Sequence, residues 1–265
     1  MPLYEVYAIK YAHHARRAAE NFIGGVPHDA HDGPMPLDYF VWLIRGGEGA
    51  NAREIVVDTG FSAPMAAKRQ RDHLRCPTEG LGFLAVDAKG VKDVVITHLH
   101  YDHVGNFDLF PAATFHLQDR EMNYATGRHM ARTVFGGAYE VDDVVGMVRR
   151  VYAGRVRFHD GDAELAPGIS LHLIGGHTLG MQVVRVATRR GRVVLASDAS
   201  HLYANMEEVR PFPIVYSVAD MVAGYDRLLA LADSPAHIIP GHDPLVLARY
   251  PAPSGGLQGI VARLD

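Results

Sequence analysis

The chain has 265 residues, of which 48% are hydrophobic and 21% are charged, and its formal net charge is −4. This composition is that of an ordinary globular protein and excludes an intrinsically disordered chain. The charge balance gives no electrostatic footprint for a nucleic-acid partner. Cys76 is the only cysteine, which excludes an internal disulfide and a zinc site built from several cysteines.

The chain also lacks the sequence signals of membrane insertion or export. No apolar run approaches the roughly 18 residues that a membrane helix needs. The N-terminal segment carries charges and histidines where a secretory signal would have an apolar centre. We therefore expect a cytoplasmic protein without a membrane partner.

Short runs rich in β-branched and aromatic residues predict strands at 4–9, 38–44, 53–60, 92–98, 113–118, 169–175, 182–188, 192–198 and 236–241. Helical periodicity lies between them, at about 63–74, 119–131, 141–152 and 217–233. This order predicts a layered α/β protein in which two sheets pack together and helices cover the outside. No long linker divides the chain, so we expect one domain over residues 1–265. Segment 24–36 is expected to be an ordered loop, and 250–259 a surface tail.

Metal-binding side chains are concentrated in ITHLHYDHVGN, residues 96–106. The apolar residues before this motif predict that it follows a buried strand. Residues i and i+2 of an extended segment point the same way, so His98 and His100 can bind one metal ion. Asp102 and His103 follow a bend and would face a second ion. Histidine and carboxylate without thiolate suit zinc, with iron, cobalt, nickel and manganese as alternatives.

Three more candidate ligands follow predicted strands in the second half of the chain: His177, Asp198 and His242. Each comes after an apolar predicted strand and a tight turn that contains glycine or serine. Together with the first motif they supply five histidines and two aspartates, enough for two metal ions that share a carboxylate. The other eleven of the 16 histidines are expected to be structural or surface residues.

With these motifs, the sequence from about Asp58 to Asp243 resembles the metallo-β-lactamase superfamily. The resemblance implies a four-layer αββα sandwich. It also implies two metal ions. His98, His100 and His177 would bind the first ion, and Asp102, His103 and His242 the second. Asp198 would bridge the two ions. Asp58, in VVDTG, corresponds to an aspartate that orients the ligand loop.

The charges in such a site predict its chemistry. Two divalent ions keep a residual positive charge after two aspartates and one hydroxide are counted, and this charge polarises a carbonyl. Metal binding lowers the pKa of a bridging water to about 7, so that hydroxide is present at neutral pH. The expected reaction is hydrolysis of a small-molecule ester, lactone, thioester or amide, or less readily of a phosphodiester.

Within the superfamily, the sequence is most similar to the N-acyl homoserine lactonases, the quorum-quenching lactonases. The similarity lies in SDAS (197–200), GHDP (241–244) and the overall length. Two motifs depart from that group. HTLGMQ (177–182) replaces an HTPG turn, and His201 occupies the position of a tyrosine that contacts the substrate, with Tyr203 two residues further on. We expect Asp102 and Asp198 to be catalytic through the metals, and His201 or Tyr203 to donate to the substrate.

Other functions stay open. Another hydrolase of the same fold could act on an ester, a thioester, a cyclic amide or a β-lactam. A glutathione thioesterase of this fold carries a C-terminal helical extension, and only 23 residues follow His242 here (265 − 242). A non-catalytic binding module could keep the metals for structure. Such a module would not need the bridging carboxylate of Asp198, which is present here. A homodimer is also left open.

The segment 119–150 is a candidate lid or pocket segment, together with the loop 22–37. The residues that could form an apolar pocket wall are Phe22, Phe61, Met122, Tyr124, Phe135 and Tyr139. The alternative is that these side chains only bury a helix against the sheet.

Overall fold

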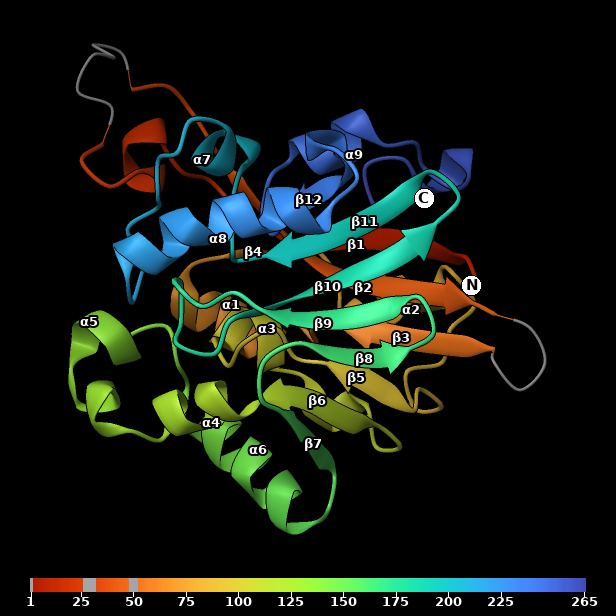
Figure 1. Cartoon of the computed structure of the whole chain (residues 1–265), viewed down its shortest axis with the longest axis horizontal. Coiled ribbons are helices and arrows are strands. Elements are labelled where there is room, and N and C mark those ends of the chain that lie inside the picture. Colours follow the sequence, from red (N-terminus) through yellow and green to blue (C-terminus); the bar gives the residue numbers. More distant parts are fainter. Residues whose placement is uncertain (1, 26–31, 48–51) are drawn as a thin grey trace.

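The structure is a computed structural model that describes residues 2–25, 32–47 and 52–265. Two β-sheets pack face to face, and helices cover the outer face of each (Figure 1). The fold is therefore mixed α/β, in the four-layer αββα arrangement that the sequence predicts. Within the described residues, no helix is long and apolar enough to span a membrane.

The first sheet has eight strands within the described residues, in the order β13-β1-β2-β3-β5-β6-β7, with β4 also pairing with β1. Their bounds are β1 Tyr4–His14, β2 Leu37–Gly46, β3 Arg53–Val57, β4 Asp72–His73, β5 Asp93–Val95, β6 Thr114–Gln118, β7 Val156–His159 and β13 Val261–Arg263. Strands β3, β5, β6 and β7 are parallel. Because parallel strands end at the same edge of a sheet, the segments after β3 and β5 emerge side by side.

The second sheet has the order β12-β11-β10-β9-β8. Its strands are β8 Ala163–Ala166, β9 Ile169–Leu173, β10 Gln182–Thr188, β11 Gly191–Ser197 and β12 Ile238–Pro240. Strands β8 to β11 pair in antiparallel fashion, whereas β11 and β12 are parallel. The segments after β11 and β12 therefore also leave the sheet at one common edge.

The helices are α1 Ala63–Arg69, α2 Pro77–Gly82, α3 Tyr101–Val104, α4 Asp119–Ala125, α5 Thr133–Gly136, α6 Val141–Tyr152, α7 Tyr203–Glu207, α8 Val218–Leu231 and α9 Leu245–Arg249. Residues of α2, α3, α4 and α6 pack in one core with the first sheet. Residues of α8 pack in another core with the second sheet. Figure 1 shows α8 along the outer side of the strands β10 and β11.

Alternation along the strands explains why both faces of each sheet are apolar. Val94 packs on the helix side of the first sheet, and Val95 packs between the sheets. In the second sheet, Val183 likewise packs on the helix side and Val184 packs between the sheets. Successive side chains of a strand point to opposite faces, so a strand buried on both sides has a continuous apolar run. This pattern is what made these strands visible in the sequence.

All nine predicted strands are present, but β4, β7, β8 and β13 were not predicted because they are short or contain charged residues. Helix 141–152 has the predicted bounds. The helix predicted at 63–74 ends at Arg69, because Gln70 adopts a left-handed conformation with φ 56°. The helix predicted at 119–131 divides into α4 and a 3₁₀ turn over Arg128–Ala131.

The sequence also predicts two segments without regular secondary structure. Part of the loop 24–36, residues 26–31, lies outside the described residues. The segment 250–259 is largely exposed, as predicted, and contains a 3₁₀ turn at Gly255–Leu257. Directly after it, β13 pairs with β1 at the edge of the first sheet.

Candidate metal centre

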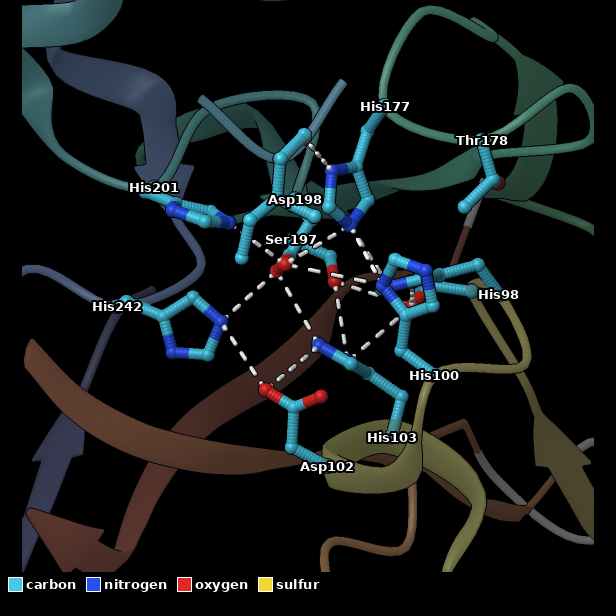
Figure 2. A network of polar contacts seen from close by, with 12 residues as sticks. His98, His100, Asp102, His103, His177, Thr178, Ser197, Asp198, His201 and His242 are labelled. Carbon is cyan, nitrogen blue, oxygen red and sulfur yellow. Dashed lines mark hydrogen bonds and ion pairs between the residues drawn. The ribbon is translucent and has the colours of Figure 1, made fainter. Parts of the chain in front are cut away.

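The seven side chains predicted as ligands converge where the two sheets end (Figure 2). His98 and His100 follow β5, Asp102 and His103 lie in α3, and the others follow β9, β11 and β12: His177, Asp198 and His242. All seven are at most 9% exposed. Strand ends from both sheets thus bring together residues that are far apart in the sequence.

The first group within this cluster consists of three imidazoles. His98 Nε2 lies 3.0 Å from His100 Nδ1. His177 Nε2 lies 3.1 Å from His98 Nε2 and 2.9 Å from His100 Nδ1. Three ring nitrogens that face one point at such spacings fit the coordination of one ion, for which zinc–nitrogen distances are about 2.1 Å.

The second group consists of Asp102, His103 and His242. Asp102 Oδ2 lies 3.6 Å from His103 Nε2 and 3.8 Å from His242 Nε2. The two carboxylate oxygens of Asp198 face different groups. Its Oδ1 is 3.3 Å from His103 Nε2 and 3.0 Å from His242 Nε2. Its Oδ2 is 3.3 Å from His177 Nε2 and 3.9 Å from His98 Nε2.

Two buried atoms of the cluster test whether these residues suit metal ions. His103 Nε2 and Asp198 Oδ1 have no hydrogen-bond partner among the described residues. Buried polar atoms are nearly always satisfied, because an unpaired one costs about 1–3 kcal/mol. A metal ion between them would satisfy both atoms, so the donor set fits divalent ions.

Hydrogen bonds behind the imidazoles fix their tautomers. His103 Nδ1 donates to Asp58 Oδ2 at 2.7 Å. His177 Nδ1 donates to the Ile214 carbonyl at 2.7 Å, and His242 Nδ1 donates to the Asp38 carbonyl at 3.0 Å. With the proton held on Nδ1, the Nε2 lone pair of each ring is directed into the cluster, as metal-binding histidines require.

Asp58, for which the family resemblance implies a role in orienting the ligand loop, lies directly behind this loop. It is fully buried, and its carboxylate also accepts hydrogen bonds from Thr97 N and Thr97 Oγ1, both at 2.8 Å. Thr97 immediately precedes His98. One carboxylate therefore holds both ends of the motif that runs from His98 to His103.

The pKa values of the histidines differ between the two groups. Burial and the neighbouring imidazoles hold the pKa values of His98 and His100 well below the usual range. Burial also lowers the pKa of His103, but the carboxylates of Asp198 and Asp102 outweigh it and raise that pKa well above its usual range. The first group thus offers neutral lone pairs. The carboxylates of the second group favour a positive charge at His103 Nε2, which a proton or a metal ion can supply.

Sequence reasoning missed Glu121, a fully buried carboxylate in α4. It accepts hydrogen bonds from Leu99 N at 2.9 Å, Thr178 Oγ1 at 2.6 Å and Gly180 N at 3.1 Å. It therefore ties the loop of His98 and His100 to the loop of His177. A Cβ on Gly180 would lie 2.1 Å from Glu121 N, so only glycine permits this approach. No spacing in the sequence indicates such a contact.

A cavity of about 260 Å³ opens onto the cluster. Its lining includes His201 and five of the seven clustered side chains: His100, Asp102, His177, Asp198 and His242. The segment 119–150 reaches it through Thr133, Val134, Gly137 and Ala138, and the loop 22–37 through Leu37. The remaining lining comes mainly from aromatic and basic residues of β1, β2 and the segments beside α1 and α3.

The structure places none of the six predicted pocket residues in this lining, because their side chains pack in the protein interior instead. Phe61 is fully buried against Tyr11, and the ring of Phe22 lies under Arg210. Met122, Tyr124 and Phe135 pack in or against the core of the first sheet. Tyr139 donates to Glu121 at 2.8 Å and packs edge-on against His100. It therefore supports a predicted ligand from behind.

His201 and Tyr203 have different positions. His201 lines the cavity, donates from Nε2 to Asp198 Oδ2 at 2.9 Å and stacks on Phe212. Burial lowers its pKa to about 3, which keeps the ring neutral. Tyr203 is not brought to the cluster. Its ring packs in the core between the sheets, with Arg249 3.8 Å from the ring centre.

Comparisons with known proteins identify the superfamily of this chain. Residues 35–242 match the family model of the metallo-beta-lactamase superfamily. The chain is 33% identical over 230 residues to the N-acyl homoserine lactonase AttM of Azorhizobium caulinodans, an alignment that covers 80% of this chain and 84% of that protein. The chain therefore belongs to the metallo-β-lactamase superfamily.

Solved structures support the same fold. A quorum-quenching N-acyl homoserine lactone lactonase superposes with a TM-score of 0.73 at 21% identity, over 92% of this chain and 93% of that one. AidC, a dizinc quorum-quenching lactonase, superposes with a TM-score of 0.64 at 16% identity, over 89% of this chain and 86% of that one.

We expect protein purified without chelators to contain about two divalent ions per chain, because the cluster offers two donor groups and a shared carboxylate. His177→Ala should lose about one ion, whereas His172→Gln, which replaces a buried histidine of β9 bonded to Asp162 and Ser170, should keep both. Metal analysis measures both values. A single ion in the wild type, or equal losses in the two variants, would contradict the dinuclear interpretation.

Proposed function

We propose that this chain is a dinuclear metal-dependent hydrolase that opens a lactone. The observation that carries the proposal is the position of Asp198, whose two oxygens face the two groups of ring nitrogens at 3.0–3.3 Å. The relatives named above are N-acyl homoserine lactonases, which makes a five-membered lactone the first substrate class to test. Zinc is the first candidate metal, because AidC is a dizinc enzyme and the donors are imidazole and carboxylate.

Divalent ions held by these seven residues would lower the pKa of a water molecule and polarise a carbonyl group. The side chains would provide the rest of the reaction environment. Asp102, His201 and other members of the cluster line one small cavity, so a substrate that enters it meets them directly. Opening a lactone ring forms an alkoxide, which must take up a proton. This proton comes from the water molecule whose hydroxide attacks the carbonyl group, and we propose that the carboxyl group of Asp102 carries it to the alkoxide.

We further propose that residues 1–265 form one catalytic domain and that the segment 119–150 bounds the substrate. Four of its residues line the cavity, and they lie in or beside α5. Val134, in α5, is 80% exposed although it is apolar, so a substrate that covers it would gain from burial.

The proposal predicts that Asp198→Asn loses at least about a thousandfold in kcat/KM, because a neutral amide cannot replace a carboxylate shared by two cations. Asp233→Asn, at an exposed ion pair with Arg192, is the matched control and should retain the activity. The assay uses metal-loaded protein with acyl homoserine lactones, simple γ-lactones, aryl esters, a cephalosporin and a glutathione thioester.

The pattern of activity across this panel separates the candidate functions. Opening of the lactones in preference to the other compounds is the expected result. Turnover of the thioester or the β-lactam alone would assign a different hydrolase of the same fold. If metal-loaded wild-type protein hydrolyses none of the compounds, the non-catalytic binding module replaces our proposal.

Of the two residues predicted to face the substrate, we propose that His201 affects catalysis, through its hydrogen bond to Asp198. His201→Phe should lower kcat by about tenfold or more, since a hydrogen bond to a charged group contributes about 1.5–3 kcal/mol. His201→Gln can restore an N–H donor and should recover part of the loss. Tyr203→Phe should stay within about twofold of the wild type. Steady-state kinetics with metal analysis tests this, and equal effects of His201→Phe and Tyr203→Phe would refute it.

A further inference from the structure

Four basic side chains line the cavity beside the metal-binding cluster, and the proposed reaction uses none of them: His14, Arg16, Arg69 and Arg71. They come from two neighbouring segments. His14 and Arg16 lie at the end of β1 and just beyond it, and Arg69 and Arg71 lie at the end of α1 and just beyond it. A lactone ring and a neutral acyl chain would offer no anionic partner to the three arginines among them.

The fold fixes Arg71 in this position. Gln70 ends α1 in a left-handed conformation, and Arg71 N then donates to the Ala66 carbonyl at 2.8 Å. The chain continues directly into β4, which pairs with β1 through His13 and Asp72. The pairing places Arg71 beside the end of β1 and over the cavity.

The guanidinium group of Arg71 is held only by neutral groups. Its Nε donates to Tyr39 Oη at 2.9 Å and to Tyr101 Oη at 3.3 Å. Its Nη1 donates to the Arg69 carbonyl at 2.6 Å and to His14 Nε2 at 3.1 Å. Burial, with the charges of Arg71 and Arg16, lowers the pKa of His14 to about 4, so His14 is a neutral acceptor here.

The neighbouring cations differ from Arg71 in having carboxylate partners. Arg69 Nη2 lies 2.6 Å from Glu140 Oε1, and Lys68 contacts the same carboxylate at 2.7 Å. Arg16 Nε lies 3.9 Å from Glu20 Oε1. Among the described residues, none places a carboxylate within 4.0 Å of Arg71, which is partly buried.

This arrangement leaves the charge of Arg71 uncompensated in the cavity wall. Nε and Nη1 of Arg71 already donate within the protein, so Nη2 is the nitrogen that can donate to a carboxylate, and the rigid placement of the group reduces the entropy lost on binding. Arg16 and Arg69 each contact a carboxylate, although Lys68 shares the one beside Arg69. Among the described residues that line the cavity, Arg71 is thus the guanidinium group without an acidic partner, and one carboxylate is its natural complement.

We propose that Arg71, with Arg16 and His14 beside it, binds a carboxylate that the substrate carries away from the bond that is hydrolysed. The substrate is then an anionic lactone or ester. Tyr101 connects the two parts of the site, because its hydroxyl contacts Arg71 and the next residue is Asp102. This assignment of the substrate class rests on the proposed hydrolase function.

The test compares γ-lactones that carry a carboxylate on short or longer alkyl arms with their primary amides, which have nearly the same shape without the charge. We expect metal-loaded wild-type protein to prefer at least one carboxylate over its amide by about tenfold or more in kcat/KM, mainly through KM. Arg71→Gln should reduce this ratio to about one. Arg71→Lys, which keeps the charge but not the planar donor set, should retain part of it.

Arg69→Gln is the matched control, since it removes a guanidinium group of the same cavity that is already paired with Glu140. It should change the carboxylate-to-amide ratio by less than about threefold. Equal kcat/KM for carboxylates and amides in the wild type at every arm length would overturn the proposal. An equal change of the ratio in Arg69→Gln and Arg71→Gln would also overturn it.

A binding measurement separates this proposal from the proposed hydrolase function. Calorimetry with glutarate and its monoamide, on metal-loaded protein, requires no turnover. We expect glutarate to bind at least about tenfold more tightly than the monoamide in the wild type and with nearly equal affinity in Arg71→Gln. That result with no hydrolysis of any lactone would refute the hydrolase and retain the carboxylate site. If the protein hydrolyses lactones but binds glutarate and its monoamide equally well, the carboxylate site is refuted and the hydrolase is retained.

Discussion

The burial of one carboxylate, that of Asp198, is the constraint on which the rest of this site depends. A charged group that is 3% exposed is stable only if cations or strong donors surround it. Burial raises the pKa of Asp198, yet His242, His103 and His201 outweigh it and keep the pKa well below its usual range. The imidazoles alone leave Asp198 Oδ1 without a hydrogen bond. Metal ions are the groups that complete this environment.

The backbone around Asp198 is shaped to allow this burial. Ser197, directly before it, adopts φ 44°, and Asp58 at the end of β3 adopts φ 62°. Such conformations cost about 1–3 kcal/mol in non-glycine residues and are concentrated at functional sites. A Cβ on Gly241 would lie 2.7 Å from Asp198 Oδ1, so the residue before His242 must be glycine. The left-handed residues after β3 and at the end of β11, together with the glycine after β12, thus shape the backbone around the buried carboxylate of Asp198.

Residue types and their spacing predicted much of the fold and the seven clustered side chains, because alternating apolar strands and ligands at strand exits are local patterns. The contacts that support and extend the site are not local. Glu121 reaches the ligand loops from α4, and Arg71 reaches the cavity only because β4 pairs with β1. The direction of a side chain after a bend cannot be read from sequence, so the segment SDASHLY leaves both His201 and Tyr203 as candidates. The aromatic residues expected in the pocket wall pack into the core, since apolar side chains at helical spacing suit either role.

We infer that the two donor groups hold two metal ions with Asp198 between them. Anomalous X-ray scattering from crystals of the zinc-loaded protein, collected at the zinc absorption edge, measures the positions of these ions directly. We expect two peaks in the cluster, one among His98, His100 and His177 and the other among Asp102, His103 and His242, with one oxygen of Asp198 on each. A single peak in the cluster, or two peaks of which one lies away from Asp198, would contradict this inference.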